Sequence, residues 1–143
     1  MPLLPPGVSL AAINCRKEIC PALPKALPIF SHNLTQAILD GTNPGPPIGE
    51  TMGYTLHSVK DGQVVFRGAP SFAMTNPMGT VHGGWYGTLL DSAMACAIMT
   101  KVPRGSVYTT LEYKINILRG LPIGMEIDCT GVIDHVGRST GVA

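Results

Sequence analysis

The chain has 143 residues, which is enough for one domain with its own hydrophobic core. Its 10 Lys and Arg residues nearly balance its 9 Asp and Glu residues, so the composition gives no support for general nucleic-acid binding, which usually shows a basic excess. No apolar run reaches the roughly 18–20 residues of a membrane span. The beginning of the sequence lacks a basic segment followed by an apolar run, so we do not expect a secretory signal.

The N-terminal segment is rich in proline, with Pro at positions 2, 5, 6, 21, 24 and 28. Prolines at this density interrupt helices and strands. We therefore expect residues 1–30 to form an irregular extension and residues 31–143 to form the folded domain. At the start of that domain, the apolar spacing around Leu34 and Ile38 predicts a short amphipathic helix that Gly41 ends.

A linker and a hairpin are expected next. Residues 42–49 are rich in Pro and Gly, which is typical of a linker. Residues 51–59 and 63–69 then alternate apolar and polar side chains, with Lys60-Asp61-Gly62 between them. An Asp-Gly pair between two such runs is a strong signal for a β-hairpin. Residues 70–80 are expected to form a loop.

A long apolar helix is predicted at about residues 83–101, before Pro103. Between Trp85 and Thr100 its only charged side chain is Asp91. A buried carboxylate is unfavourable unless a partner compensates it. Gly83 and Gly84 stand at the start of this helix, where the first N–H groups are open to an outside acceptor.

Alternating segments at 106–118 and 125–136 predict two more strands, and residues 139–143 look like the start of a third. The order of elements favours an α+β domain in which an antiparallel sheet wraps around one buried helix. Four cysteines, at positions 15, 20, 96 and 129, show neither C-x-x-C nor zinc-type spacing. Free thiols of this kind indicate a reducing compartment, so we expect a cytoplasmic protein.

These segments together resemble the hot-dog fold acyl-coenzyme A (CoA) thioesterases, and in particular their phenylacetate-degradation (PaaI-like) branch. The resemblance extends over residues 34–143. It rests on Asn76-Pro77-x-Gly79-x-Val81-His82-Gly83-Gly84 followed by Leu89-Leu90-Asp91, on Tyr108-Thr109-Thr110, and on Gly131-x-Ile133-x-His135-x-Gly137-Arg138. Members of this family usually continue for about twenty more residues, so the resemblance implies that the final strand is truncated here.

The resemblance also implies roles for individual residues. The backbone N–H of Gly83 would bind the thioester oxygen, and Asp91 would act as nucleophile or general base. Asn76 would help to place the carbonyl or a water, and His82 would shape the loop. A strand hydroxyl often assists, which implies Thr110 and less readily Thr109. Gly84 and Thr109 are then expected beside the substrate.

Physical chemistry supports the two central roles. A thioester carbonyl gains negative charge when it is attacked, and a fixed N–H at a helix start stabilises that charge. A carboxylate in an apolar wall becomes a better base. Eight helical residues separate Gly83 from Asp91, a span of about 12 Å, so both cannot reach one carbonyl from the same chain. We therefore expect a homodimer or homotetramer with the site between subunits.

Several alternatives remain open at this point. Asp91 is instead a structural acid if it bonds a neighbour such as Thr88 or Ser92, and Asn76 before Pro77 is an ordinary turn pair. Asp91 and His82 have no third partner at a suitable spacing, so no metal is expected. No cofactor is expected either, because water, a carboxylate and an amide dipole suffice.

Two other functions compete with an acyl-CoA hydrolase. A hot-dog dehydratase or hydratase is disfavoured, because there a His closely follows Asn-Pro, whereas His82 comes five residues after Pro77. The second is a non-catalytic acyl-CoA-binding or subunit-partner domain. The nature of the acyl group cannot be predicted from these residues.

Overall fold

The computed structural model describes residues 11–15, 32–103 and 106–143. In chain order its elements are β1 (Ala11–Cys15), α1 (His32–Leu39), α2 (Pro47–Met52), β2 (Tyr54–Lys60), β3 (Gln63–Gly68), a 3-10 turn (Phe72–Met74), α3 (Gly83–Met99), β4 (Tyr108–Tyr113), β5 (Ile127–Val132), β6 (His135–Val136) and β7 (Thr140–Val142).

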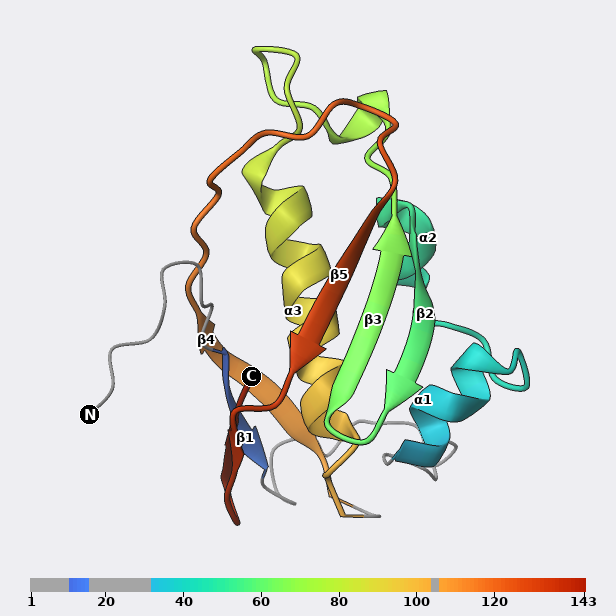
Figure 1. Ribbon diagram of the computed structural model, residues 1–143, viewed down its shortest axis with the longest axis vertical. Helices are drawn as coiled ribbons and strands as arrows, with labels where there is room; N and C mark the ends of the chain where they lie inside the picture. Colours follow the sequence, from blue (N-terminus) through green and yellow to red (C-terminus); the bar gives the residue numbers. More distant parts are fainter. Residues whose placement is uncertain (1–10, 16–31, 104–105) are drawn as a thin grey trace.

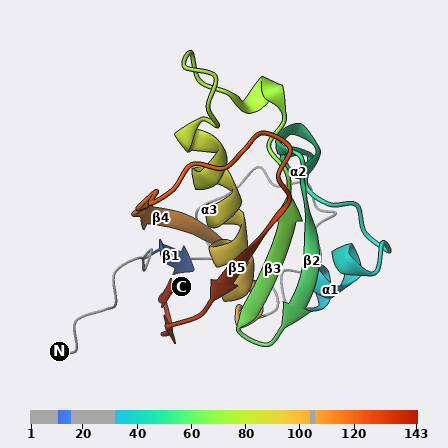
Figure 2. The same cartoon turned by 45° about the horizontal axis from the view of Figure 1, so that its top comes forward.

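The strands form two antiparallel sheets around the long helix α3 (Figure 1). One sheet has the order β2-β3-β5, and the other has the order β4-β1-β7-β6. Figure 2 shows α3 between the β2-β3-β5 sheet on one side and β4 and β1 on the other. The expected α+β architecture, with antiparallel strands around a central helix, is therefore confirmed.

The core lies between α3 and the β2-β3-β5 sheet. Trp85 and Leu89 of α3 are only 1% and 2% exposed, and they belong to the same buried cluster as Val64 and Phe66 of β3. Strand β5 crosses α3 so closely that a Cβ atom at Gly131 would overlap the carbonyl oxygen of Ala93. Glycine is therefore the residue that fits at this crossing.

The predicted hairpin is confirmed. Lys60 pairs with Gln63, so Asp61 and Gly62 form a two-residue loop. Gly62 has a φ of 76°, a left-handed conformation that glycine adopts without strain. Its N–H donates to the Thr100 hydroxyl at 2.9 Å, which ties the hairpin to the end of α3.

The linker predicted at residues 42–49 is wrong in its second half, and so is the strand start at Thr51. Residues 47–52 form α2 instead. Pro47 occupies the first helical position, where its fixed φ suits a helix and its missing N–H costs no hydrogen bond. Gly53 ends the helix in a left-handed conformation, with a φ of 71°.

The last strands are shorter than the alternation predicted. The segment 106–118 is a strand only over β4, and the segment 125–136 is divided into β5 and β6. The break comes at Ile133 and Asp134. The Ile133 N–H bonds the carbonyl of Gly62 in the β2–β3 loop, and the Asp134 N–H bonds the carbonyl of Val142 in β7 of the other sheet. Residues 139–143 do contain a further strand, β7, which pairs with β1 and β6.

The irregular extension expected for residues 1–30 contains a strand, which corrects the prediction for that part. β1 spans residues 11–15 and pairs with β4 and β7. This stretch lies between the prolines at positions 6 and 21, so each of its residues keeps the backbone N–H that a sheet requires. Residues 1–10 and 16–31 lie outside the described residues.

Candidate active site

The start of α3 leaves one backbone donor open. His82 is the N-cap, and its ring Nδ1 accepts a hydrogen bond from the Gly84 N–H at 2.9 Å, while its carbonyl accepts from the Trp85 N–H. The Gly83 N–H has no acceptor among the described residues, and Gly83 is exposed. Of the two glycines predicted to contact the substrate, Gly83 is therefore the one with a free donor.

Asn76 shapes the loop before the helix. Its side-chain oxygen accepts from the N–H groups of Met78 and Thr80, at 3.0 and 3.2 Å, and its amide nitrogen donates to the Thr80 hydroxyl at 2.8 Å. The loop closes through a β-bridge between Thr75 and Val81. The amide of Asn76 is thus engaged within the loop, as the turn interpretation predicted, and its role toward a substrate stays a prediction.

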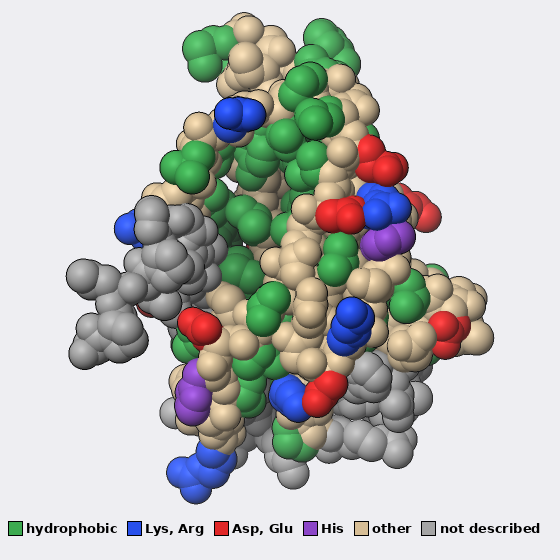
Figure 3. Space-filling view, viewed as in Figure 1, with side chains coloured by type: hydrophobic (Ala, Val, Ile, Leu, Met, Phe, Trp, Pro, Cys, Tyr) green, Lys and Arg blue, Asp and Glu red, His purple; other side chains and the backbone are tan. Residues whose placement is uncertain are grey.

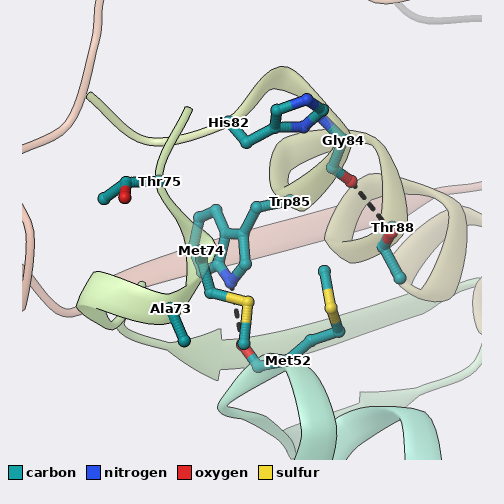
Figure 4. A pocket seen from close by; sticks show the side chains of 8 residues that line it. All are labelled: Met52, Ala73, Met74, Thr75, His82, Gly84, Trp85 and Thr88. Atoms are coloured by element: carbon teal, nitrogen blue, oxygen red, sulfur yellow. Dashed lines mark hydrogen bonds between the residues drawn. The ribbon is translucent and has the colours of Figure 1, made fainter. Parts of the chain in front are cut away.

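A cavity of about 320 Å³ adjoins the start of α3. Figure 4 shows its eight lining residues, with His82 and Gly84 above Trp85 and Met52 below it. The Trp85 ring is fixed because its Nε1 donates to the Met52 carbonyl at 2.8 Å. Met74 adds a third apolar wall, so the cavity combines apolar walls with the helix start.

The carboxylate of Asp91 has a specific partner on β4. The Thr110 hydroxyl donates to Asp91 Oδ1 at 2.8 Å, across 19 positions of the chain. Thr88 and Ser92, the neighbours considered as partners, bond other groups. The structure therefore brings Thr110 to Asp91, whereas Thr109 alternates with it and is exposed.

Two groups near Asp91, the buried Tyr54 and the partly buried Cys96, stay protonated. The Tyr54 hydroxyl bonds Ser92 at 2.9 Å; burial raises the pKa of Tyr54, and the negative charge of Asp91 raises it further. Burial, with a smaller effect of Asp91, raises the pKa of Cys96 to about 12. Cys96 is therefore no thiolate nucleophile at neutral pH. The sequence does not predict that Tyr54 lies near Asp91, because this depends on how β2 packs against α3.

Gly83 and Asp91 lie on the same face of α3, two turns apart. The segment that begins with β4 covers this face: Thr110 contacts Asp91, and Ile117 lies 3.6 Å from where a Cβ of Gly83 would be. The helix is continuous between them, so the separation of about 12 Å holds. Within one chain the structure does not bring the open N–H and the carboxylate together.

One group of ion pairs lies on the outer face of the β2-β3-β5 sheet, where Figure 3 shows charged side chains gathered. Arg67 makes two hydrogen bonds to Asp128, at 2.6 and 2.9 Å, and Glu126 lies 3.9 Å away. The Arg67 guanidinium lowers the pKa of Asp128 through the hydrogen bond and its charge. These groups are paired on the far side of the sheet from α3, so they take no part in the site.

No group of three His, Cys, Asp or Glu side chains in the described residues is placed to hold a metal ion. No helix in the same part of the chain is long and apolar enough to cross a membrane.

Comparisons with known proteins agree on one class. The family model described as Thioesterase superfamily matches residues 78–143, a stretch that includes Gly83, Asp91 and Thr110. A search of curated protein sequences finds no significant match. Several solved structures share the fold.

A phenylacetic acid degradation-related protein from Ralstonia eutropha is 22% identical, with a TM-score of 0.67 over 76% of this chain and 96% of that one. A mutant of the phenylacetic acid degradation protein PaaI from Thermus thermophilus is 25% identical, with a TM-score of 0.59 over 68% and 86%. Zebra fish thioesterase superfamily member 2 is 27% identical, with a TM-score of 0.56 over 80% and 85%.

The chain has the hot-dog fold, and its residues 78–143 are similar to the Thioesterase superfamily. Solved structures that share this fold include PaaI proteins of phenylacetic acid degradation.

Proposed function

We propose that this protein is an acyl-CoA thioesterase that hydrolyses an aryl- or medium-chain acyl-CoA to the free acid and CoA. The observation that carries the proposal is the state of the Asp91 carboxylate. One of its oxygens is held by Thr110, and the other has no partner among the described residues. A carboxylate fixed in this way, half-buried in an apolar helix, is suited to attack a carbonyl carbon or to activate a water.

The Gly83 N–H supplies the second part of the chemistry. The carbonyl oxygen of a thioester accumulates negative charge when its carbon is attacked, and a fixed amide donor stabilises that charge. As general base, Asp91 takes a proton from water while the water oxygen bonds the carbonyl carbon. The carbon–sulfur bond then breaks, and Asp91 returns the proton to the sulfur. As nucleophile, Asp91 bonds the carbonyl carbon, the carbon–sulfur bond breaks, and CoA leaves as a thiolate. Water then hydrolyses the mixed anhydride to the acid and the free Asp91 carboxylate, and the proton released goes to the thiolate.

The site is proposed to lie between two copies of the chain, with Gly83 from one and Asp91 from the other. The 12 Å span of about eight helical residues excludes a site made by one copy. β4 is an outer strand of its sheet in the described part of the chain, so its free edge is open to a second copy. Leu111 and Leu118, on β4 and after it, are 54% and 83% exposed, which also favours a partner on this side. We propose a homodimer as the minimum assembly, with a homotetramer built from it as an alternative.

The cavity at the start of α3 is the proposed acyl-binding site. Its volume of about 320 Å³ lies at the lower end of the range of ligand pockets. Met52, Met74 and Trp85 give it apolar walls, and His82 and Gly84, the residues on either side of Gly83, also line it. Such a cavity suits an aryl or medium-length acyl group. Water and these groups of the chain suffice for the reaction, so we propose that it uses no cofactor, and that the enzyme works in the cytoplasm.

Free-thiol release from a panel of CoA esters tests the proposal. The panel contains phenylacetyl, hydroxylated aryl and medium-chain acyl groups, and Asp91→Asn is compared with the natural chain. We expect the variant to lose activity by a factor of about 100 or more. Asp134→Asn, at an exposed carboxylate, is the matched control and should keep full activity. Unchanged turnover in Asp91→Asn would remove Asp91 from the mechanism, and no release from any ester would favour a non-catalytic binding domain.

A further inference from the structure

Strand β4 contains a bulge next to Thr110. Ile13 pairs with Thr110 and the preceding residue, Ala12, pairs with Glu112, so Leu111 faces no partner. A bulge inserts one extra residue and changes the side of the sheet to which the following side chains point. Tyr113, three residues after Thr110, would face the opposite side in a regular strand, but the bulge brings it to the same side.

The contacts of Tyr113 agree with this change of side. Its hydroxyl oxygen lies 3.1 Å from where a Cβ of Gly87 would be, so it lies directly over α3. Gly87 is buried in the middle of the helix, where glycine is unfavourable. A larger side chain at position 87 would press against the Tyr113 hydroxyl and against Ile115, whose Cδ1 lies 3.2 Å from the same point. The glycine therefore makes room for the tyrosine.

Gly87 precedes Asp91 by one helical turn on the same face. Helical side chains lean toward the N-terminus of the helix, so the Asp91 carboxylate leans toward the place that the Tyr113 hydroxyl occupies. No direct hydrogen bond joins the two groups. Thr110 donates only to Asp91 Oδ1, so Asp91 Oδ2 has no hydrogen-bond partner among the described residues. The Tyr113 hydroxyl also has none among them. A single water that bonds both groups would give each of them a partner.

We propose that Tyr113 is a further catalytic residue, whose hydroxyl holds the attacking water together with Asp91 Oδ2. This inference rests on the function proposed above and specifies its general-base form. The water gives one proton to Asp91 Oδ2, and its oxygen bonds the carbonyl carbon. The carbon–sulfur bond breaks, and the proton on Asp91 passes to the sulfur. Tyr113 donates a hydrogen bond to the water oxygen and keeps its own proton throughout. Thioester and water become carboxylic acid and thiol.

Tyr113→Phe is the direct test, because it removes the hydroxyl and keeps the ring. We expect kcat to fall about tenfold, the effect of one hydrogen bond, with KM changed by less than about twofold. The thermal midpoint should not change. The loss should be equal for a CoA ester and for the matching thioester of an acidic aryl thiol, because both need the same water. A loss confined to the CoA ester would mean that Tyr113 protonates the leaving sulfur, which would overturn the proposal, as would full activity.

Gly87→Ala is the second variant. Its methyl group should displace the Tyr113 hydroxyl and lower kcat by a similar factor. The double variant Gly87→Ala, Tyr113→Phe should then be no slower than either single variant, since both remove one interaction. Additive losses would contradict the mechanism. Asp91→Asn and the natural chain are measured alongside. No thiol release by the natural chain refutes the proposed function, and full activity of Asp91→Asn refutes the general-base mechanism. An inactive Asp91→Asn with a fully active Tyr113→Phe refutes only the role of Tyr113.

Discussion

Replacing Gly83 by proline removes one backbone N–H from the proposed site and should leave the fold intact. Gly83 is the first residue of α3, where the fixed φ of proline suits a helix and its missing N–H breaks no helical hydrogen bond. His82 has a φ of −67° and a ψ of 137°, the extended conformation that a residue before proline prefers. The variant therefore separates chemistry from folding.

The size of the expected loss follows from the arrangement at the helix start. Removing one oxyanion donor lowers kcat by about 100- to 1,000-fold, or ~2.7–4 kcal/mol of transition-state stabilisation. Gly84 does not replace the donor, because its N–H is bonded to His82 at 2.9 Å. Gly83→Ala is the matched control. It keeps the N–H, and its methyl group would lie an ordinary 3.6 Å from Ile117, so its kcat should stay within about twofold.

Thiol release at saturating ester, with thermal unfolding of all three chains, measures both effects. We expect equal unfolding midpoints, an active alanine variant and a nearly inactive proline variant. A folded Gly83→Pro chain with the natural kcat would show that this N–H does not bind the oxyanion.

Three further predictions concern other contacts. Thr110→Val should lower kcat about tenfold in the thiol-release assay, because Asp91 loses its donor, and Thr110→Ser should restore most of it. Gly131→Ala should lower the free energy of unfolding in urea by about 1–3 kcal/mol, because its Cβ would overlap a carbonyl of α3. Gly120→Ala, which meets no atom within 4 Å, is its control, and equal midpoints would contradict the close crossing. Desolvation raises the pKa of Cys96 to about 12, so this thiol should resist iodoacetamide in the native protein at pH 8, and rapid labelling found by peptide mass spectrometry would contradict the raised pKa.

The central helix and the hairpin were predictable because their signals are local. Apolar residues on every side of the segment after Gly84 indicate a buried helix, and α3 begins at Gly83 as expected. Asp61 and Gly62 give the hairpin its two-residue loop. The same locality explains why a free N–H at Gly83 and a carboxylate at Asp91 could be proposed from the sequence.

The elements that were missed depend on context. α2 begins with Pro47 and ends before Gly53, and in the sequence such residues are equally typical of a linker. The sequence of β1 shows no alternation of apolar and polar residues, and the segment is a strand because it pairs with β4 and β7. The bulge at Leu111 could not be predicted either. Apolar and polar side chains alternate regularly over residues 106–118, and only the pairing register with β1 shows the extra residue.

The hydrogen-bond partner of Asp91 could not be derived from the residue pattern alone. Thr88 and Ser92 are its neighbours along the helix, yet the hydrogen bond comes from Thr110, which the fold brings from another element. The sequence pointed to Thr110 only through its resemblance to a family. Tyr113 had no such signal, because a bulge decides the side to which it points.

Mixing two inactive variants tests the central claim most directly, namely that Gly83 of one copy and Asp91 of another form one site. Gly83→Pro and Asp91→Asn chains are each purified, then unfolded and refolded together, and thiol release is measured. In a two-fold symmetric dimer half of the assemblies contain both chains, and each of these has one intact site, so the mixture should regain about a quarter of the natural activity. A mixture as inactive as its two components, with mixed dimers shown to be present, would contradict the account.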